Sequence, residues 1–272
     1  AIQHNDETID VPKEMMPILD KPLIQYAVEE ALDAGIEEII FITGRGKSSI
    51  EDHFDHSFEM EQILTKRKKT TSLKKVKSMI LNPGSFVYVR QQEPAGLGHA
   101  VWCARHLVGS EPVAILLADD LILGKVGCLK QMINKWKGGN MVAVTKVPKN
   151  LTASYGIITP GEIDENLIEV LKIEEKPLPK NAESDLAVVG RYIIENEVFD
   201  HLSLQKKGAL DEIQLTDSLS SQINKMPFYG LQFSGERFDC GTKSGFIKAN
   251  ISVALKDPEI GFDVSNWIKS IL

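Results

Sequence analysis

The sequence predicts an α/β fold, with a doubly wound, largely parallel sheet in the first half and a mixed-sheet extension in the second. Two observations predict this fold. Short apolar runs alternate with helical segments over the first 150 residues, and strand-like runs with fewer helices between them follow. Since we find no repeat, low-complexity stretch or linker, we expect one compact unit.

The first helix and strand have clear sequence signals. Leu23–Ala34 has apolar residues at helical spacing, follows Pro22 and stops at Gly35, which is typical of a helix with a proline start and a glycine stop. Glu38–Thr43 is a short β-branched run, which predicts a strand buried on both faces of a parallel sheet. We expect Ser48 to cap a second helix.

Further apolar runs predict the remaining elements. Strands are expected at Phe86–Arg90, Val113–Leu117, Met141–Val147, Gly156–Thr159, Leu167–Ile173, Leu186–Ile194 and Phe228–Phe233. The segment after Gly98 reads as helical, and a C-terminal helix around Ile247–Ala254 is expected to serve packing or oligomer contacts.

Composition limits the classes of protein. The 272 residues, 43% of them hydrophobic, can bury a substantial core, and the net charge of -7 argues against a general nucleic-acid binder. Cys103, Cys128 and Cys240 are too widely spaced for a CxxC metal site or a disulfide framework, so reduced thiols are expected. Ala1–Asp10 is polar, and no run is long and apolar enough to cross a bilayer, which predicts a cytoplasmic protein.

Two aspartates follow strand-like runs. Asp119 lies in the segment LLADDL and Asp239 in the segment FDCGT. Open α/β sheets bind ligands at the carboxyl ends of their strands, and a carboxylate there suits Mg²⁺. Turn or helix-cap aspartates are the alternative that the residues leave open.

Two glycine-bearing loops could approach a nucleotide. Gln91–Ala100 (QQEPAGLGHA) joins a strand to a helix, where glycines and free N–H groups can meet a base or a phosphate. Gly44–Ser48 (GRGKS) resembles part of a P-loop, but Phe41 stands where that pattern needs its first glycine. A surface loop is therefore the simpler interpretation of GRGKS.

Two charged segments have structural alternatives. Lys66–Lys77 carries seven basic residues but lacks the interleaved aromatic residues of a nucleic-acid stacking platform, so a solvated helical face or a mobile loop is favoured. In Glu174–Pro177 (EEKP), Glu175 could accept hydrogen bonds from sugar hydroxyls and Lys176 could meet a phosphate. A surface ion pair explains the same residues.

Taken together and in this order, the motifs resemble the bacterial UTP–glucose-1-phosphate uridylyltransferases. The matching stretches run from about Val11 almost to the C-terminus, and include PKEMMP at 12–17, GLGHA at 96–100, LLADDLIL at 116–123, EEKP at 174–177, AVVGRY at 187–192, DEIQLTD at 211–217 and DCGTK at 239–243. The resemblance implies a Rossmann-like, doubly wound mixed sheet of the nucleotidyltransferase type. It implies a single domain over 1–272, with a nucleotide-binding half at about 11–150, an interwoven sugar-binding part at about 151–245 and C-terminal helices at 246–272.

The resemblance also implies a reaction, in which UTP and glucose 1-phosphate give UDP-glucose and pyrophosphate. The implied catalytic residues are Lys13, Asp119 and Lys176; those for the nucleotide are Gln91, Gly96 and Asp119; those for the sugar are Gly156, Glu175, Lys176 and Gly190; and Asp119 and Asp239 would hold Mg²⁺. A homo-oligomer is implied, with no nucleic-acid or membrane partner. Glucose against an epimer, and UTP against dTTP, stay open.

One end of the chain departs from the family pattern. The family begins with a buried strand and a GxGTR-type loop around the nucleotide phosphates, whereas Ala1–Asp10 (AIQHNDETID) has no glycine, arginine or apolar run. A truncated gene product, a misassigned start and a remodelled end are competing explanations. We therefore expect the first strand to be missing and uridylyltransferase activity to be very low. The alternative function is an impaired relative that binds a nucleotide sugar or an intact paralogue.

Overall fold

The structure is a computed structural model that describes residues 11–271. The first part contains η1 (Lys13–Met15), β1 (Pro17–Ile18), β2 (Lys21–Pro22), α1 (Leu23–Ala34), β3 (Ile39–Thr43), α2 (Ser48–His53), α3 (Phe58–Lys66), α4 (Thr70–Lys77), β4 (Phe86–Arg90), α5 (Leu97–Cys103), β5 (Val113–Leu116), β6 (Asp120–Leu123), α6 (Cys128–Lys135) and β7 (Asn140–Lys146). The second part contains η2 (Lys149–Ser154), β8 (Gly156–Asp164), β9 (Leu167–Glu175), β10 (Leu186–Ile194), α7 (Glu197–Leu202), η3 (Ala209–Asp211), α8 (Leu215–Ser220), β11 (Phe228–Gln232), β12 (Glu236–Asp239), α9 (Lys243–Lys256) and α10 (Gly261–Ile271).

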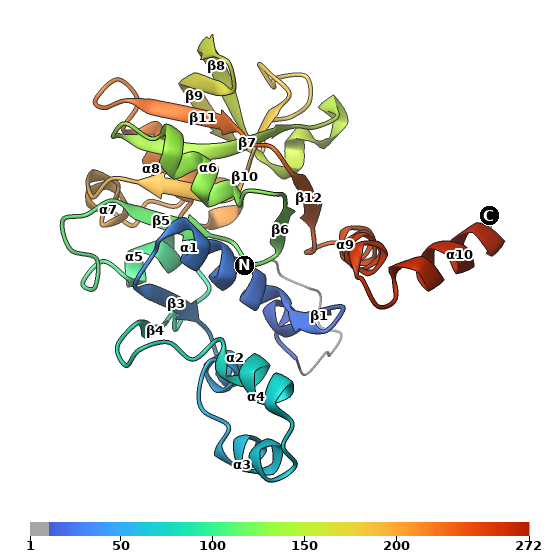
Figure 1. The fold of residues 1–272 in the computed structure, drawn as a ribbon. Coiled ribbons are helices and arrows are strands. Elements are labelled where there is room, and N and C mark those ends of the chain that lie inside the picture. The colour runs from blue at the N-terminus through green and yellow to red at the C-terminus, as the bar shows by residue number, and fades with distance from the viewer. Residues whose placement is uncertain (1–10, 272) are drawn as a thin grey trace.

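A mixed sheet with helices around it forms the main body, as Figure 1 shows. Helices α2, α3 and α4 lie at one end of the molecule, and α9 and α10 extend to one side. The missing first strand and glycine-rich loop were predicted from residues 1–10, which lie outside the described residues.

Six strands form the central sheet, in the order β5-β10-β7-β11-β9-β8. Its mixed character confirms the predicted class, and so does the parallel first half: β5 and β7 run in one direction, since β10 is antiparallel to both, and β3 pairs with β4 in parallel. β7 pairs with β11 in parallel, whereas β10, from the second half of the chain, lies antiparallel between β5 and β7. All nine residues of β10 are buried, so this strand takes a central position that a half-exposed strand could not fill.

β3 and β4 form a separate parallel pair in the described residues. Only Phe41 and Thr43 of β3 are buried there, so the predicted burial of this strand on both faces is not found. Phe41 stacks on Phe54 and on Tyr88, with ring centroids 5.1 Å apart in each case. Aromatic packing therefore joins this pair of strands to α2.

The helix signals are confirmed for α1 and corrected for α2. Helix α1 follows Pro22 and ends at Gly35, whose φ of 97° is in the left-handed region that glycine adopts without strain. Helix α2 begins at Ser48 itself, with Lys47 before it and no side-chain cap. The predicted cap by Ser48 is wrong because the helix starts one residue earlier than a Ser48 cap requires.

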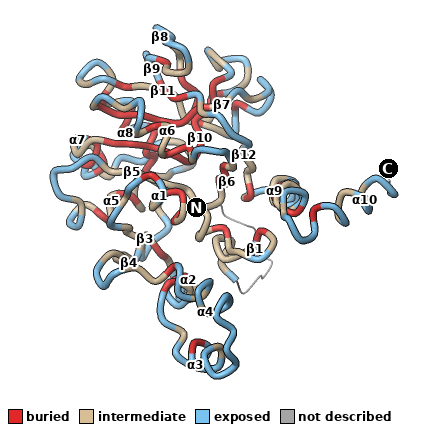
Figure 2. Tube along the Cα trace, viewed as in Figure 1, coloured by how far each residue is buried: buried red, intermediate tan, exposed pale blue. Residues whose placement is uncertain are grey.

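Alternate residues of β7 face two apolar layers. Val142 and Val144 pack into a core shared with α5, α7 and α8, and Met141 and Ala143 into one shared with α1 and α6. Figure 2 shows this buried centre in red. The period of two therefore fixes the sheet between two groups of helices.

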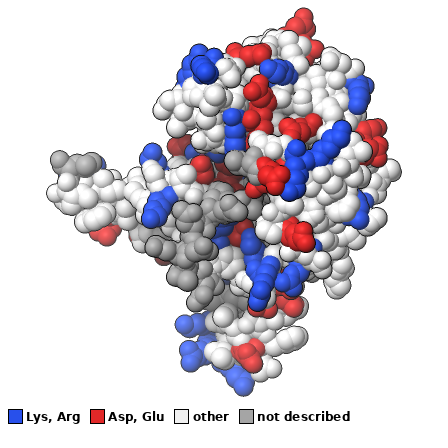
Figure 3. All heavy atoms as spheres, turned by 180° about the vertical axis from the view of Figure 1, so that it is seen from behind, with Lys and Arg blue, Asp and Glu red and all other residues white. Residues whose placement is uncertain are grey.

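The basic segment Lys66–Lys77 contains the last residue of α3, a short turn and the whole of α4, so of the two expected forms, a helical face or a mobile loop, it is mainly the helical one. Lys77 pairs with Glu61 at 3.1 Å and Lys75 with Asp20 at 3.5 Å. In Figure 3 cationic side chains at this end of the molecule lie beside anionic ones. No helix among residues 11–271 has the length and apolar content needed to cross a membrane.

Candidate active site

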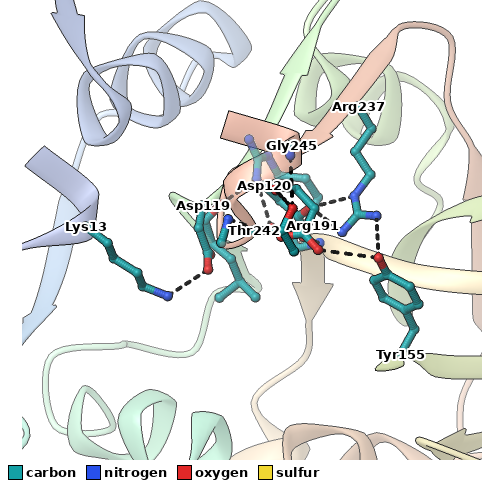
Figure 4. Close-up of polar contacts among 12 residues, drawn as sticks. Lys13, Asp119, Asp120, Tyr155, Arg191, Arg237, Thr242 and Gly245 are labelled. Carbon is teal, nitrogen blue, oxygen red and sulfur yellow. Dashed lines mark hydrogen bonds and ion pairs between the residues drawn. The ribbon is translucent and has the colours of Figure 1, made fainter. Parts of the chain in front are cut away.

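Lys13 and Asp119 meet across the site, although 106 residues separate them in sequence (Figure 4). The Lys13 ammonium donates to Asp119 Oδ2 at 2.7 Å, and both side chains are about four-fifths buried. Burial alone would raise the pKa of Asp119, but the charge and hydrogen bond of Lys13 hold that pKa below its usual value. The carboxylate is therefore charged at neutral pH.

The turn that carries Asp239 lies against the turn that carries Asp119. The N–H of Cys240 donates to the carbonyl of Asp119 at 2.8 Å, and the β6–β12 pair sets Asp239 opposite Asp120. Asp239 Oδ1 accepts from the N–H of Gly241 at 3.1 Å. Two acidic turns far apart in sequence thus converge beside Lys13. No group of three or more His, Cys, Asp and Glu residues able to hold a metal occurs within residues 11–271.

Asp120 has a structural environment that differs from that of its neighbour. Its Oδ2 accepts from the N–H of Gly190 at 2.8 Å, and its Oδ1 lies 2.5 Å from the guanidinium of Arg237. Arg237 also donates to the Tyr155 hydroxyl at 3.4 Å, and that hydroxyl donates to Asp239 Oδ2 at 3.4 Å (Figure 4). Sequence reasoning missed Arg237, which lies in no pattern typical of a site, and it assigned no role to Tyr155, although the segment YGI at 155–157 also matches the family.

The loop before α5 brings Gln91 and Gly96 together. Gln91 Nε2 donates to the Gly96 carbonyl at 3.2 Å and lies 2.9 Å from His99 Nδ1. The φ of Gly96 is 104°, and a Cβ there would lie 2.8 Å from the Ile213 carbonyl oxygen. A glycine is therefore required at position 96 by both conformation and space.

Glu175 is the last residue of strand β9 and lies beside Gly156, and Lys176 follows it. Glu175 Oε2 accepts from the Thr216 hydroxyl at 2.6 Å, and a Cβ on Gly156 would lie 3.3 Å from the same oxygen. The N–H of Lys176 donates to the Tyr155 carbonyl at 3.0 Å, which joins this group to the aspartate turns. Lys176 has a φ of 48°, and its ammonium lies 3.8 Å from Glu175 Oε1.

Gly190 lies on β10, which pairs with β8, and it packs against the turn that precedes β6. A Cβ on Gly190 would come within 2.6 Å of Leu117 Cβ and 2.8 Å of Asp120 Oδ2. The strand β10 must therefore carry a glycine here for the turn to approach it this closely.

The segment 211–217 connects the two groups of predicted residues. The backbone of Ile213 exchanges hydrogen bonds of 2.8 Å with Ala95 and Gly98, and Thr216 binds Glu175. A Cβ on Gly98 would lie 2.7 Å from the Ile213 carbonyl oxygen, so this segment packs directly on the glycine loop. In the sequence, the only indication that this segment belongs to the site was its match to the family motif DEIQLTD.

The Gly44–Ser48 loop lines a separate cavity of about 280 Å³ together with Tyr88 and Arg90. Lys47, the lysine of this motif, binds Glu14 at 2.7 Å. The structure does not bring this loop into contact with Asp119 or Asp239, which agrees with the simpler surface-loop interpretation.

The mixed α/β sheet, with a lysine and acidic turns at its strand ends, defines the class of a nucleotidyltransferase. The family model described as nucleotidyl transferase matches residues 7–255. The uridylyltransferase of Staphylococcus haemolyticus is 45% identical over 263 residues, 96% of this chain and 91% of that protein. The UTP–glucose-1-phosphate uridylyltransferase of Komagataeibacter xylinus is 46% identical, over 95% of this chain and 89% of its own. The chain belongs to the UTP–glucose-1-phosphate uridylyltransferase family, which confirms the resemblance.

Solved structures agree with this assignment. A UDP-glucose pyrophosphorylase complexed with UDP-glucose is 41% identical, with a TM-score of 0.83 over 91% of this chain and 92% of its own. A UTP-bound enzyme from Acinetobacter baumannii is 35% identical, with a TM-score of 0.88 over 97% and 93% of the two chains. The described fold is thus that of known uridylyltransferases.

Proposed function

We propose that this enzyme transfers the uridylyl group of UTP to glucose 1-phosphate, releasing pyrophosphate. The observation that carries the proposal is the convergence of Lys13, Asp119 and the Asp239 turn, in a chain whose relatives are named for this reaction. We infer that Gln91 and Gly96 recognise the uracil edge. We further infer that Glu175 binds glucose hydroxyls in a pocket shaped by Gly156 and Gly190.

The oxygen donors of Asp119 and Asp239 fit Mg²⁺, which takes oxygen ligands and is commonly bound by one or two carboxylates together with substrate phosphates. Two protein carboxylates are enough for such a site. The described site offers two adjoining acidic turns, and no larger cluster of metal ligands is found within residues 11–271. Bound there, Mg²⁺ would supply neutralisation of phosphate charge.

The reaction requires the protein to position the two substrates and to neutralise negative charge on their phosphates. The sugar phosphate is already an anion at neutral pH, so its oxygen can attack the α-phosphorus without a strong general base. In this proposal Lys13 stabilises the charge that develops on departing pyrophosphate, and Lys176 holds the sugar phosphate in line with it. Acid–base work is not required of Asp119, because no proton has to be removed from the attacking phosphate oxygen.

A turnover assay beside calorimetric binding tests this function. The 272-residue chain should form labelled UDP-glucose only when UTP, glucose 1-phosphate and Mg²⁺ are all present, and should prefer UTP over dTTP and glucose over its epimers. Binding of UDP-glucose without any turnover would instead support the nucleotide-sugar-binding alternative. Absence of both would refute the proposed function.

Replacing Glu175 by Gln should raise the KM for glucose 1-phosphate about tenfold to a hundredfold, because a hydrogen bond to a charged acceptor contributes about 1.5–3 kcal/mol. The Thr216 hydroxyl can still donate to the amide oxygen, so the local fold should persist. The matched control is Glu174→Gln, since Glu174 is half-exposed and pairs with Lys172 at 3.1 Å. An unchanged KM in the Glu175 variant would contradict the sugar-binding role. Steady-state kinetics with varied glucose 1-phosphate measure both variants.

We also propose that the enzyme forms a homo-oligomer and works in the cytoplasm. Large apolar side chains are exposed on the two C-terminal helices, and they include Ile251 (41%) on α9 and Phe262 (83%) and Trp267 (61%) on α10. Burial of such a surface against a second chain would stabilise an assembly.

A further inference from the structure

A buried ion pair joins the first helix to the central strand behind the aspartate turn. Arg191 on β10 has a side chain 1% exposed, and Glu30 on α1 has a side chain 7% exposed. Arg191 Nε lies 3.1 Å and 3.2 Å from the two Glu30 oxygens, and Nη2 lies 2.8 Å from Oε2. This is a two-pronged contact that a lysine could not reproduce, because the guanidinium presents its donors in a fixed plane.

The remaining donor of Arg191 is directed at backbone. Nη1 donates to the carbonyl of Leu117 at 3.0 Å and to that of Gly190 at 2.9 Å. Glu30 Oε1 in turn accepts from the N–H of Leu129 at 2.9 Å. Every polar group of the pair therefore has a partner, which a fully buried charge pair requires.

Those contacts fall on the turn that presents Asp119. The N–H of Leu117 donates to the Gly190 carbonyl at 2.8 Å, and the N–H of Asp120 donates to the Leu117 carbonyl at 3.2 Å. Asp120 is held from its other side by the N–H of Gly190. Asp119 thus lies between Leu117 and Asp120, whose N–H groups donate to the carbonyls of Gly190 and Leu117. Arg191 Nη1 donates to the same two carbonyls.

We propose that Arg191, oriented by Glu30, is a positioning residue that fixes the Leu117–Asp120 turn so that Asp119 faces the metal. The inference rests on the proposed role of Asp119 as a metal ligand. Stability alone does not account for the pair, because apolar residues of similar volume commonly replace buried ion pairs without loss of stability. A guanidinium, by contrast, binds a carboxylate and two carbonyls at once.

The test compares the affinity for Mn²⁺ alone, measured by electron paramagnetic resonance, in four variants and the wild type. Glu30→Met with Arg191→Met removes both charges together, so the fold should survive while the turn loses its anchor. Its Mn²⁺ affinity should fall about tenfold to a hundredfold, as is typical when a group behind a metal ligand is removed. Arg191→Lys keeps the charge but not the planar donors, and should not restore the affinity. Lys135→Met with Glu165→Met removes a surface pair of 3.0 Å and should bind as wild type.

The fourth variant, Asp119→Asn, separates the two proposals. Loss of Mn²⁺ binding in this variant, with unchanged binding in the double methionine variant, would overturn the positioning role and leave the metal site standing. Wild-type binding by Asp119→Asn would overturn the metal site itself. Thermal unfolding shows whether the double methionine variant folds. If it does not fold, the Arg191→Lys variant decides the test. Wild-type Mn²⁺ affinity in Arg191→Lys would overturn the inference, and a tenfold loss would support it.

Discussion

Replacing Asp119 by Asn is expected to lower kcat about 1000-fold. The asparagine keeps the shape of the side chain but removes the negative charge that would hold Mg²⁺ beside the phosphates, and losing one preorganised electrostatic group in an active site commonly costs a factor of 100 to 1000. In the ligand-free protein the variant also removes the negative charge that Lys13 contacts at 2.7 Å. Radiometric turnover at saturating substrates, which detects slow rates, measures the effect.

The control for this variant is Asp164→Asn, because Asp164 lies at the exposed end of β8. Its kcat should equal that of the wild type. A decrease of less than tenfold in the Asp119 variant would contradict the proposed metal role.

The neighbouring aspartates show where sequence reasoning stops. The segment LLADDL predicted an acidic turn after a strand, and the structure has one, but the sequence could not assign different roles to the two carboxylates. Asp119 meets Lys13, whereas Asp120 is turned to Gly190 and Arg237. That difference depends on β12 and β10, which lie far away in sequence.

Local pattern predicted the strands far better than their arrangement. Leu186–Ile194 was placed from its apolar run with the bounds that the structure has. Its antiparallel position between β5 and β7 depends on long-range pairing that no local period encodes. The short strands β6 and β12 were missed for the same reason, because each is four residues long and exists through pairing with the other.

The predicted site residues came mostly from motifs, and their supporting residues did not. Glu175 was proposed for sugar hydroxyls, yet Thr216, which holds its carboxylate, lies 41 residues away on α8. Arg191 and Glu30 were not singled out, because a buried pair separated by 161 residues leaves no local signature in either segment. Such partners can be found only when the fold is known.

Replacing Lys13 by Gln is expected to lower kcat by a factor of about 100 to 1000, because the charge developing on pyrophosphate would lose its cation. Lys13 and Asp119 touch, so their effects should not be additive. The double variant with Asp119→Asn should therefore be about as slow as the slower single variant, as is usual for residues that act as a unit.

Turnover of the four proteins in this cycle, measured well below the unfolding temperature of each, tests the coupling. Lys75→Gln is the matched control, since Lys75 is 77% exposed and its contact to Asp20 at 3.5 Å is a surface one. Multiplicative effects in the double variant would mean that Lys13 and Asp119 act on separate steps. In that case the 2.7 Å contact between Lys13 and Asp119 would form only in the ligand-free protein. Another cation would then have to stabilise the negative charge on pyrophosphate.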